Sequence, residues 1–144
     1  MSQQTHFKIV VMEDSEVYNA LLTQKLKLYT ESLSLDRNCE INVVSYIQLS
    51  EFIKNMTEDI DLLFLDYYLA KNITASDIIP KIKEVCKNCT IVIISRTYDV
   101  ERVSNLIEDG VAEFIFKDHT AMDKACFIVK KTIFDRLEIS AQQE

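Results

Sequence analysis

Five polar residues that each follow a short apolar run have the side chains needed for phosphoryl transfer. They are Glu13, Asp14, Asp66, Ser95 and Lys117. Three clustered carboxylates repel one another and raise each other's pKa unless a cation joins them. A hard divalent ion with oxygen ligands, Mg²⁺ above all, resolves that conflict. A remaining carboxylate oxygen could then attack phosphorus, while the lysine and the hydroxyl neutralise and orient the phosphoryl oxygens.

The segments that would position these residues alternate between strand-like and helix-like patterns. Apolar runs predict strands at 7–12, 40–46, 62–65, 91–95 and 113–116. Helical spacing of apolar residues predicts helices at about 15–29, 49–56, 76–86, 100–109 and 122–137. This order predicts an α/β fold, a doubly wound five-stranded parallel sheet flanked by five helices. The active crevice of such a sheet lies beyond the carboxyl ends of its strands, which is where the five polar residues fall.

Each of these polar residues also has a simpler explanation. Acidic residues after a strand often cap the next helix, which would explain Glu13 and Asp14 without any site. Ser95 alone would be a turn residue, and Lys117 a solvated surface charge. What favours a site is that all five positions fall on the same edge of the predicted sheet.

Length and composition indicate an ordinary soluble domain. The 144 residues are expected to form one domain, 1–144, with a core from about 7 to 137, and the seven residues after Leu137 are too few for an output domain. The net charge of −7 argues against direct binding to nucleic acid. No apolar run approaches the ~20 residues that cross a membrane, and the N-terminus lacks the features of a secretory signal. The expected location is therefore cytoplasmic.

Two of the four cysteines, Cys86 and Cys89, form a C-x-x-C pair. A zinc site needs about four ligands, and neither a second pair nor a nearby histidine is present. A turn between a helix end and a strand is therefore favoured over a metal or redox role. The two histidines, His6 and His119, are expected at the surface.

The acid pair at 13–14 and the motifs "LLFLD", "IVIIS" and "GVAEFIFK" occur in an order that resembles the receiver domain of bacterial two-component response regulators. The resemblance covers nearly the whole chain, from about Phe7 to Leu137. It implies a flavodoxin-like, CheY-like fold with strand order 2-1-3-4-5. It also implies a signalling protein that only assists its own phosphorylation and dephosphorylation, not a conventional enzyme.

By this resemblance, Asp66 is the phosphoacceptor and also a ligand of the cofactor, Mg²⁺. Asp14 resembles the direct Mg²⁺ ligand, and Glu13 matches the acidic partner that usually works through water. The main-chain carbonyl of Tyr68 matches the family's backbone metal ligand.

Three further positions match family residues that respond to the phosphoryl group. Ser95 occupies the Ser/Thr position whose hydroxyl follows that group, and Lys117 matches the lysine that pairs with it. Phe114 is at the aromatic position that rotates inward on activation in many members.

Four residues near these positions are expected to tune the chemistry. Asp118 stands where the family usually has a proline, often after a cis bond, so either geometry of the Lys117–Asp118 bond would be informative. Arg96 replaces a small residue and could crowd the phosphoryl pocket or offer it a fork of donors. Tyr68 and Thr97 match positions that influence the access of water to the phosphate, although both could simply be partly buried loop residues.

The resemblance implies that a histidine kinase or a histidine phosphotransfer protein phosphorylates Asp66. The change would pass to a downstream protein through the face formed by 100–109, 113–116 and 122–137. Two alternatives stay open: a pseudo-receiver that binds partners without phosphorylation, and a phosphatase with Asp66 as nucleophile. The phosphatase typically needs a second acid two residues on, where this chain has Tyr68.

Phe127 and Phe134 lie seven residues apart and project away from the apolar stripe of their helix. As an exposed aromatic pair they would mark a surface for a partner or for a homodimer. The alternative is that the segment near 30–40 folds over them.

Overall fold

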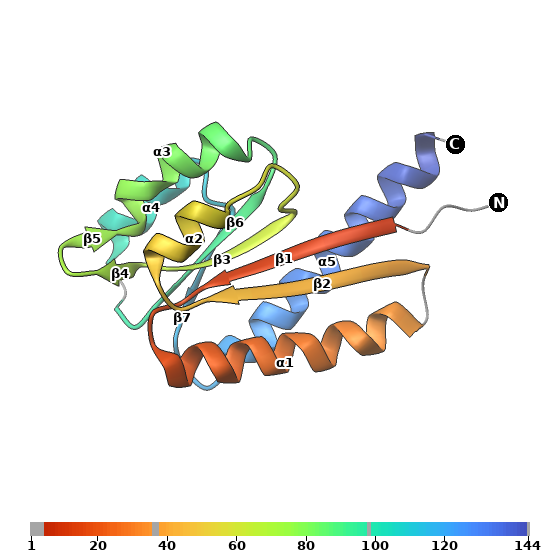
Figure 1. Ribbon diagram of the computed structural model, residues 1–144, viewed down its shortest axis with the longest axis horizontal. Coiled ribbons are helices and arrows are strands. Elements are labelled where there is room, and N and C mark those ends of the chain that lie inside the picture. Colours follow the sequence, from red (N-terminus) through yellow and green to blue (C-terminus); the bar gives the residue numbers. More distant parts are fainter. Residues whose placement is uncertain (1–4, 36–37, 98, 144) are drawn as a thin grey trace.

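The computed structural model describes residues 5–35, 38–97 and 99–143, and strands and helices alternate along them (Figure 1). The strands are β1 (Thr5–Met12), β2 (Cys39–Tyr46), β3 (Leu62–Asp66), β4 (Tyr68–Ala70), β5 (Ile73–Thr74), β6 (Thr90–Ser95) and β7 (Glu113–Phe116). The helices are α1 (Glu16–Leu35), α2 (Leu49–Asn55), α3 (Ala75–Val85), α4 (Val100–Glu108) and α5 (Ala121–Gln143). Each predicted strand and helix is present. The first and last helices continue beyond their predicted ends at residues 29 and 137.

The main sheet is parallel throughout. Within the described residues it has five strands in the order β2-β1-β3-β6-β7. This is the expected order 2-1-3-4-5 once the two strands of a separate hairpin, β4 and β5, are left out of the count. The fold class predicted from the sequence is therefore confirmed, and so is the strand order that the resemblance implied.

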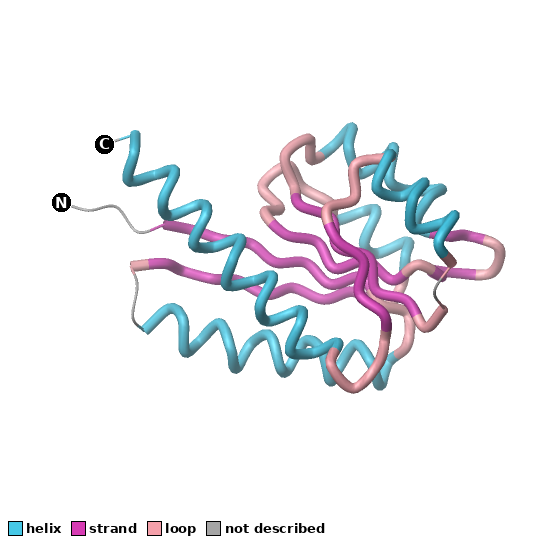
Figure 2. Tube along the Cα trace, turned by 180° about the vertical axis from the view of Figure 1, so that it is seen from behind, coloured by secondary structure: helices cyan, strands magenta, loops and turns pink. Residues whose placement is uncertain are grey.

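Helices cover both faces of the main sheet (Figure 1, Figure 2). Helices α1 and α5 pack on the face that carries Val11 and Phe64. Helices α2, α3 and α4 pack on the opposite face, which carries Leu63 and Leu65. All five residues of β3 are buried because this central strand is covered on both sides. Its continuous apolar run ends at Asp66, where the chain leaves the sheet at the carboxyl-terminal ends of the strands.

A short hairpin between β3 and α3 was not predicted. Strands β4 and β5 pair antiparallel, with Tyr68 opposite Thr74. Asn72 in the turn has a φ of 63°, a left-handed conformation that asparagine adopts more readily than most residues. Strands of three and two residues are too short to leave an alternating apolar pattern, so the sequence could not reveal them.

Gly110 follows the end of α4. Its φ is 99°, in the left-handed region that favours glycine. The N–H of Gly110 donates to the carbonyl of Ile107 at 3.0 Å, and the N–H of Val111 donates to that of Leu106 at 3.0 Å. These two bonds close the last turn of the helix.

Replacing Gly110 by alanine is expected to lower the free energy of unfolding by about 1 kcal/mol, because alanine is strained at this φ. A Cβ at this position would also lie 2.6 Å from Lys83 Nζ, but that flexible side chain can move away. Urea unfolding of Gly110→Ala in the Lys83→Ala background separates the two effects. The same loss is expected there, and a full recovery would mean that the contact with Lys83, not the backbone, sets the cost.

The four cysteines are buried and carry free thiols. As predicted, Cys86 and Cys89 lie at the turn between α3 and β6. The Cys86 thiol contacts the carbonyl oxygens of Glu58 at 3.3 Å and Ile60 at 3.2 Å, and the Cys89 thiol contacts the Cys86 carbonyl at 3.5 Å. Burial raises the pKa of Cys89 to about 12. These contacts favour a structural role for the pair.

No helix in the described part of the chain combines the length and the hydrophobicity that crossing a bilayer requires.

Candidate functional site

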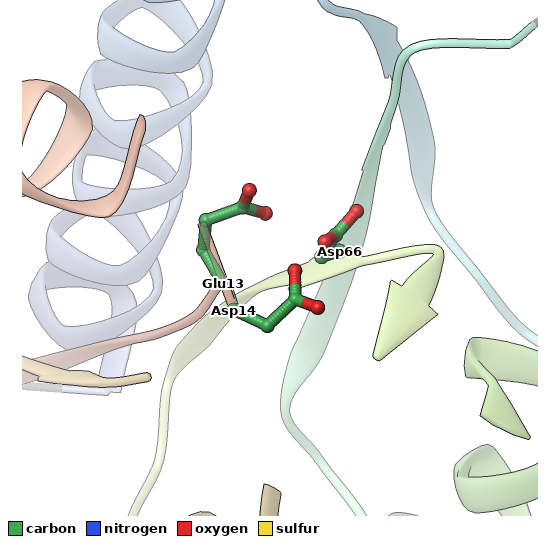
Figure 3. Close-up of side chains that lie close together, drawn as sticks. All are labelled: Glu13, Asp14 and Asp66. Carbon is green, nitrogen blue, oxygen red and sulfur yellow. The ribbon is translucent and has the colours of Figure 1, made fainter. Parts of the chain in front are cut away.

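Glu13 and Asp14 follow β1, and Asp66 ends the adjacent strand β3, so the three acids meet at one edge of the sheet (Figure 3). One carboxylate oxygen from each lies within 4.8 Å of the others. Glu13 and Asp66 are buried, whereas Asp14 is exposed. Among the described residues, no other group of three acidic, cysteine or histidine side chains is close enough to hold a metal ion.

Hydrogen bonds beyond the strand ends hold two of these acids in place. The N–H of Glu13 donates to the carbonyl of Tyr46 at 3.1 Å. The Asn19 side chain, on α1, donates to the main-chain carbonyl oxygens of Glu13 and Tyr46, each at 3.0 Å. The amide that follows Asp66 donates to the carbonyl of Ile94 at 3.0 Å. The backbone therefore stays bonded to the neighbouring strand just past each strand end, which fixes the main-chain positions from which the carboxylates extend.

Lys117 follows β7 and reaches across to the acids. Its Nζ lies 2.7 Å from Glu13 Oε1 and 3.6 Å from Asp66 Oδ1, and its side chain is only 6% exposed. Its main-chain N–H donates to the carbonyl of Ser95 at 2.8 Å, which ties the residue to the end of β6. On the side of α1, the ring centroid of Tyr18 lies 4.5 Å from Nζ. The ammonium therefore offsets part of the negative charge of a buried acidic cluster.

The environment of Asp66 makes this carboxyl a weak acid. Burial above all raises the pKa of Asp66 to about 8, and the side chains of Asp14 and Glu13 act in the same direction. Lys117 lowers this pKa but does not cancel the rise. Without a further cation, the cluster therefore holds a proton on Asp66 at neutral pH. Such a shift in a surface hollow is typical of functional sites.

A hollow of about 300 Å³ opens beside the acids. It is lined by Glu13, Asp14, Ser15, Asp66, Tyr68, Arg96 and Lys117. Glu13 Oε2 is buried and has no hydrogen-bond partner within the described residues. An unpaired buried carboxylate oxygen beside two further carboxylates fits a hard divalent cation, and Mg²⁺ prefers oxygen ligands of this kind. The main-chain carbonyl of Tyr68 stays a predicted ligand.

Ser95 and Phe114 lie beside this hollow rather than in its lining. They line a separate cavity of about 10 Å³ with Tyr67, Thr97, Asp99 and Arg102. The Ser95 hydroxyl accepts a hydrogen bond from the Thr97 N–H at 3.2 Å and lies 3.4 Å from the Thr97 hydroxyl. Phe114 is half-buried and packs against the core under α2, α3 and α4. In this structure the Ser95 hydroxyl is therefore engaged by Thr97.

The residues expected to tune the chemistry have different surroundings. Arg96 is exposed and lines the hollow. The Asp118 carboxylate accepts from the Thr120 N–H at 2.8 Å and from the Thr120 hydroxyl at 2.6 Å, within the loop just before α5. Every peptide bond between described residues is trans, including Lys117–Asp118.

Two residues near the site were not among the predicted site residues. Tyr18, on α1, is partly buried and packs against the core. The guanidinium of Arg102, on α4, lies 5.6 Å from the ring centroid of Tyr67 and 6.0 Å from that of Tyr68, and it donates to the Tyr68 hydroxyl. Tyr18 and Arg102 are each the third residue of a helix that follows a strand ending at the site, α1 after β1 and α4 after β6. This shared position in the sequence is the signal that could have identified them.

The predicted aromatic pair on α5 is only half right. Phe127 is 66% exposed, as expected. Phe134 is half-buried, packs against the core and has Lys130 Nζ 5.5 Å from its ring centroid. Of the two interpretations, the exposed one therefore holds for Phe127 but not for Phe134, which packs against the core on the face that α1 and α5 cover.

No family model matches the sequence, and no curated protein matches it. Many solved structures are nevertheless similar in fold. A response regulator receiver domain from Clostridium thermocellum has a TM-score of 0.70 and 18% identity, covering 92% of this chain and 98% of that one. The non-phosphorylated HemR receiver domain from Leptospira biflexa has a TM-score of 0.72 and 20% identity, covering 88% and 94%.

A third similar structure carries ligands. It is a response regulator protein from Burkholderia pseudomallei with a phosphorylated aspartic acid, a calcium ion and citrate. Its TM-score is 0.65 at 15% identity, and the match covers 87% of this chain and 71% of that one. At these identities the comparisons establish architecture. This chain therefore has the fold of response regulator receiver domains.

Proposed function

We propose that this chain is a receiver domain that accepts a phosphoryl group on Asp66 and signals through contacts with other proteins. The observation that carries the proposal is the setting of Asp66 at the end of a buried central strand. Its carboxylate lies with those of Glu13 and Asp14 within 4.8 Å, and 3.6 Å from the Lys117 ammonium. The phosphorylated aspartic acid and metal ion in a protein of similar fold support this proposal.

The donor would be a phosphohistidine of a histidine kinase or a histidine phosphotransfer protein. An oxygen of Asp66 attacks phosphorus, the P–N bond of the donor breaks, and its electron pair stays on the histidine nitrogen. The product is an aspartyl phosphate. Lys117 is close enough to Asp66 to donate to a phosphoryl oxygen bound there.

Glu13 and Asp14 would hold Mg²⁺ together with Asp66 and the main-chain carbonyl of Tyr68. Asp14 would be a direct ligand, and Glu13 would act through water. Mg²⁺ supplies the positive charge that the carboxylates and the incoming phosphoryl oxygens require. The unpaired Oε2 of Glu13 supports this assignment.

A phosphoryl group on Asp66 would compete with Thr97 for the hydroxyl of Ser95. If that hydroxyl turned toward the phosphate, its contacts with Thr97 at 3.2 and 3.4 Å would break. The cavity that Ser95 shares with Phe114 and Arg102 would then change shape. Phe114 belongs to β7 and Arg102 to α4, so the change would reach the surface formed by α4, β7 and α5.

That surface is the proposed contact for a downstream protein. It carries exposed apolar side chains from all three elements: Val100, Ile107, Phe116 and Phe127. A hollow of about 530 Å³ opens beside Phe127, between β7 and α5. Exposed apolar groups around a hollow are typical of protein contacts, including a homodimer through the same surface. The proposal assigns the protein to the bacterial cytoplasm, with no direct contact to nucleic acid or membrane.

The proposal is tested by incubating the protein with Mg²⁺ and acetyl phosphate and recording the intact mass. A single phosphoryl adduct is expected in the wild type and none in Asp66→Asn, which lacks the nucleophile but keeps the shape. No adduct in the wild type, together with no response to beryllofluoride, would contradict the proposal and favour a pseudo-receiver. Steady release of phosphate from unrelated phosphomonoesters would favour a phosphatase instead, although Tyr68 occupies the position of its second acid.

A further inference from the structure

The ammonium of Lys117 has an aromatic neighbour as well as two acidic ones. Glu13 Oε1 lies 2.7 Å and Asp66 Oδ1 3.6 Å from Nζ, and the ring centroid of Tyr18 lies 4.5 Å away, with Nζ over the ring. The face of an aromatic ring attracts an ammonium at this distance. Tyr18 is the third residue of α1, so the helix that begins just after the acid pair carries the ring to Lys117.

The hydroxyl of Tyr18 makes no hydrogen bond to the charged groups of the site. Within the described residues, the buried side-chain nitrogen and oxygen atoms without a hydrogen-bond partner are Glu13 Oε2 and the Tyr18 hydroxyl oxygen. Both belong to residues that contact Lys117. Burial, followed by the charge of Glu13, raises the pKa of Tyr18 to about 12, so the phenol stays neutral at physiological pH. Tyr18 therefore attracts the ammonium without adding a charge to the site.

We infer that Tyr18 is a positioning residue, whose ring holds the Lys117 ammonium between Glu13 and Asp66. This inference rests on the proposed function, because the ammonium so held is the one that would meet a phosphoryl group on Asp66. Lysine has a flexible stem and a compact charge that follows its surroundings. Without the ring, Nζ can turn toward α1 and solvent or settle on Glu13 alone. In either case Asp66 would lose its cation.

Two variants separate the ring from the hydroxyl. Tyr18→Leu removes both, whereas Tyr18→Phe keeps the ring. With Mg²⁺ and acetyl phosphate, the initial rate of phosphorylation, measured by intact mass, is expected to fall about 3- to 10-fold in Tyr18→Leu. In Tyr18→Phe it is expected to stay within about twofold of the wild type. An unchanged rate in Tyr18→Leu, or an equal loss in both variants, would overturn the inference.

Tyr29→Leu is the matched control, because it removes the same kind of ring from the same helix. Tyr29 packs against the same part of the core but lies three helical turns further along α1. Its replacement is expected to leave the phosphorylation rate unchanged. A loss as large as that in Tyr18→Leu would show a general loosening of α1 and would overturn the positioning role.

A second measurement does not depend on phosphorylation. The ring current of Tyr18 should move the ε-methylene protons of Lys117 upfield in ¹H–¹³C spectra of protein with labelled lysine. The shift is expected in the wild type and in Tyr18→Phe and should be absent in Tyr18→Leu, with Lys117→Arg identifying the resonance. No shift in the wild type overturns the inference. If the wild type shows the upfield shift but takes up no phosphoryl group from acetyl phosphate, the proposed function is overturned. The contact between Tyr18 and Lys117 then still stands.

Discussion

Between pH 6 and pH 8, the affinity of the protein for Mg²⁺ is expected to rise about 50-fold. Burial raises the pKa of Asp66 to about 8, with Asp14 and Glu13 adding to the effect. At pH 6 a bound cation must therefore displace a proton from nearly every molecule, whereas at pH 8 about half of the molecules have already lost it. Above pH 8 the affinity should level off.

Isothermal titration calorimetry in two buffers with different ionisation enthalpies measures both the affinity and the protons released. About one proton per Mg²⁺ is expected at pH 6 and about half a proton at pH 8. Asp66→Asn is the control, because it should bind Mg²⁺ more weakly and with little dependence on pH. A wild-type affinity that stays constant over this range would contradict the raised pKa of Asp66.

The same carboxyl makes the stability of the metal-free protein depend on pH. In the unfolded chain the pKa of an aspartate is about 3.9, so between pH 4 and pH 8 the folded state binds more protons than the unfolded state. The contribution of Asp66 to stability is therefore largest at low pH and is lost as the pH rises through 8. Mg²⁺ takes the place of the proton, so its stabilising effect on the thermal midpoint should be greater at pH 8 than at pH 6.

Lys117→Met is expected to lower the free energy of unfolding by about 3–5 kcal/mol at pH 8 without Mg²⁺, because it removes one partner of a buried ion pair. The Lys117 ammonium lies 2.7 Å from Glu13 Oε1, and methionine fills similar space without charge. Lys117 also lowers the pKa of Asp66, so its removal raises that pKa further. The folded variant then holds its proton more firmly, and the loss of stability should be smaller at pH 5.5 than at pH 8.

Urea unfolding at the two pH values tests this expectation. Lys81→Met, which removes an exposed charge from α3, is the matched control and should change the stability by no more than about 0.5 kcal/mol. Equal losses at both pH values in Lys117→Met would mean that lost packing, not the acidic cluster, causes the effect. With acetyl phosphate, the same variant should be phosphorylated about 100-fold more slowly.

The fold could be predicted because its determinants are local in the sequence. Strand β3 reads "LLFLD" since both of its faces are covered, and Gly110 ends α4 because it accepts a left-handed conformation. The order of strands and helices then limits the topology to a doubly wound sheet. The hairpin of β4 and β5 escaped prediction, because strands of two and three residues leave no periodic pattern.

The surroundings of individual side chains were harder to predict. The sequence left open whether Phe134 lies at the surface, and in the structure it packs against the core. By resemblance, the hydroxyl of Ser95 follows the phosphoryl group, and in this structure it accepts a hydrogen bond from Thr97. In both cases the neighbour is chosen by packing between layers or by side-chain rotation, and neither leaves a mark on the apolar pattern.

By itself, the sequence determined the order of the strands along the chain and which polar residues end them. Because parallel strands end at a common edge, it also determined that Glu13, Asp14, Asp66 and Lys117 would approach one another. Only the tertiary structure decided how close they come and what else reaches them. Lys117 and Glu13 are 104 positions apart, and their 2.7 Å contact depends on the twist and register of four strands. The ring of Tyr18 arrives from a helix packed on one face of that sheet, since packing between layers, not sequence spacing, sets such contacts.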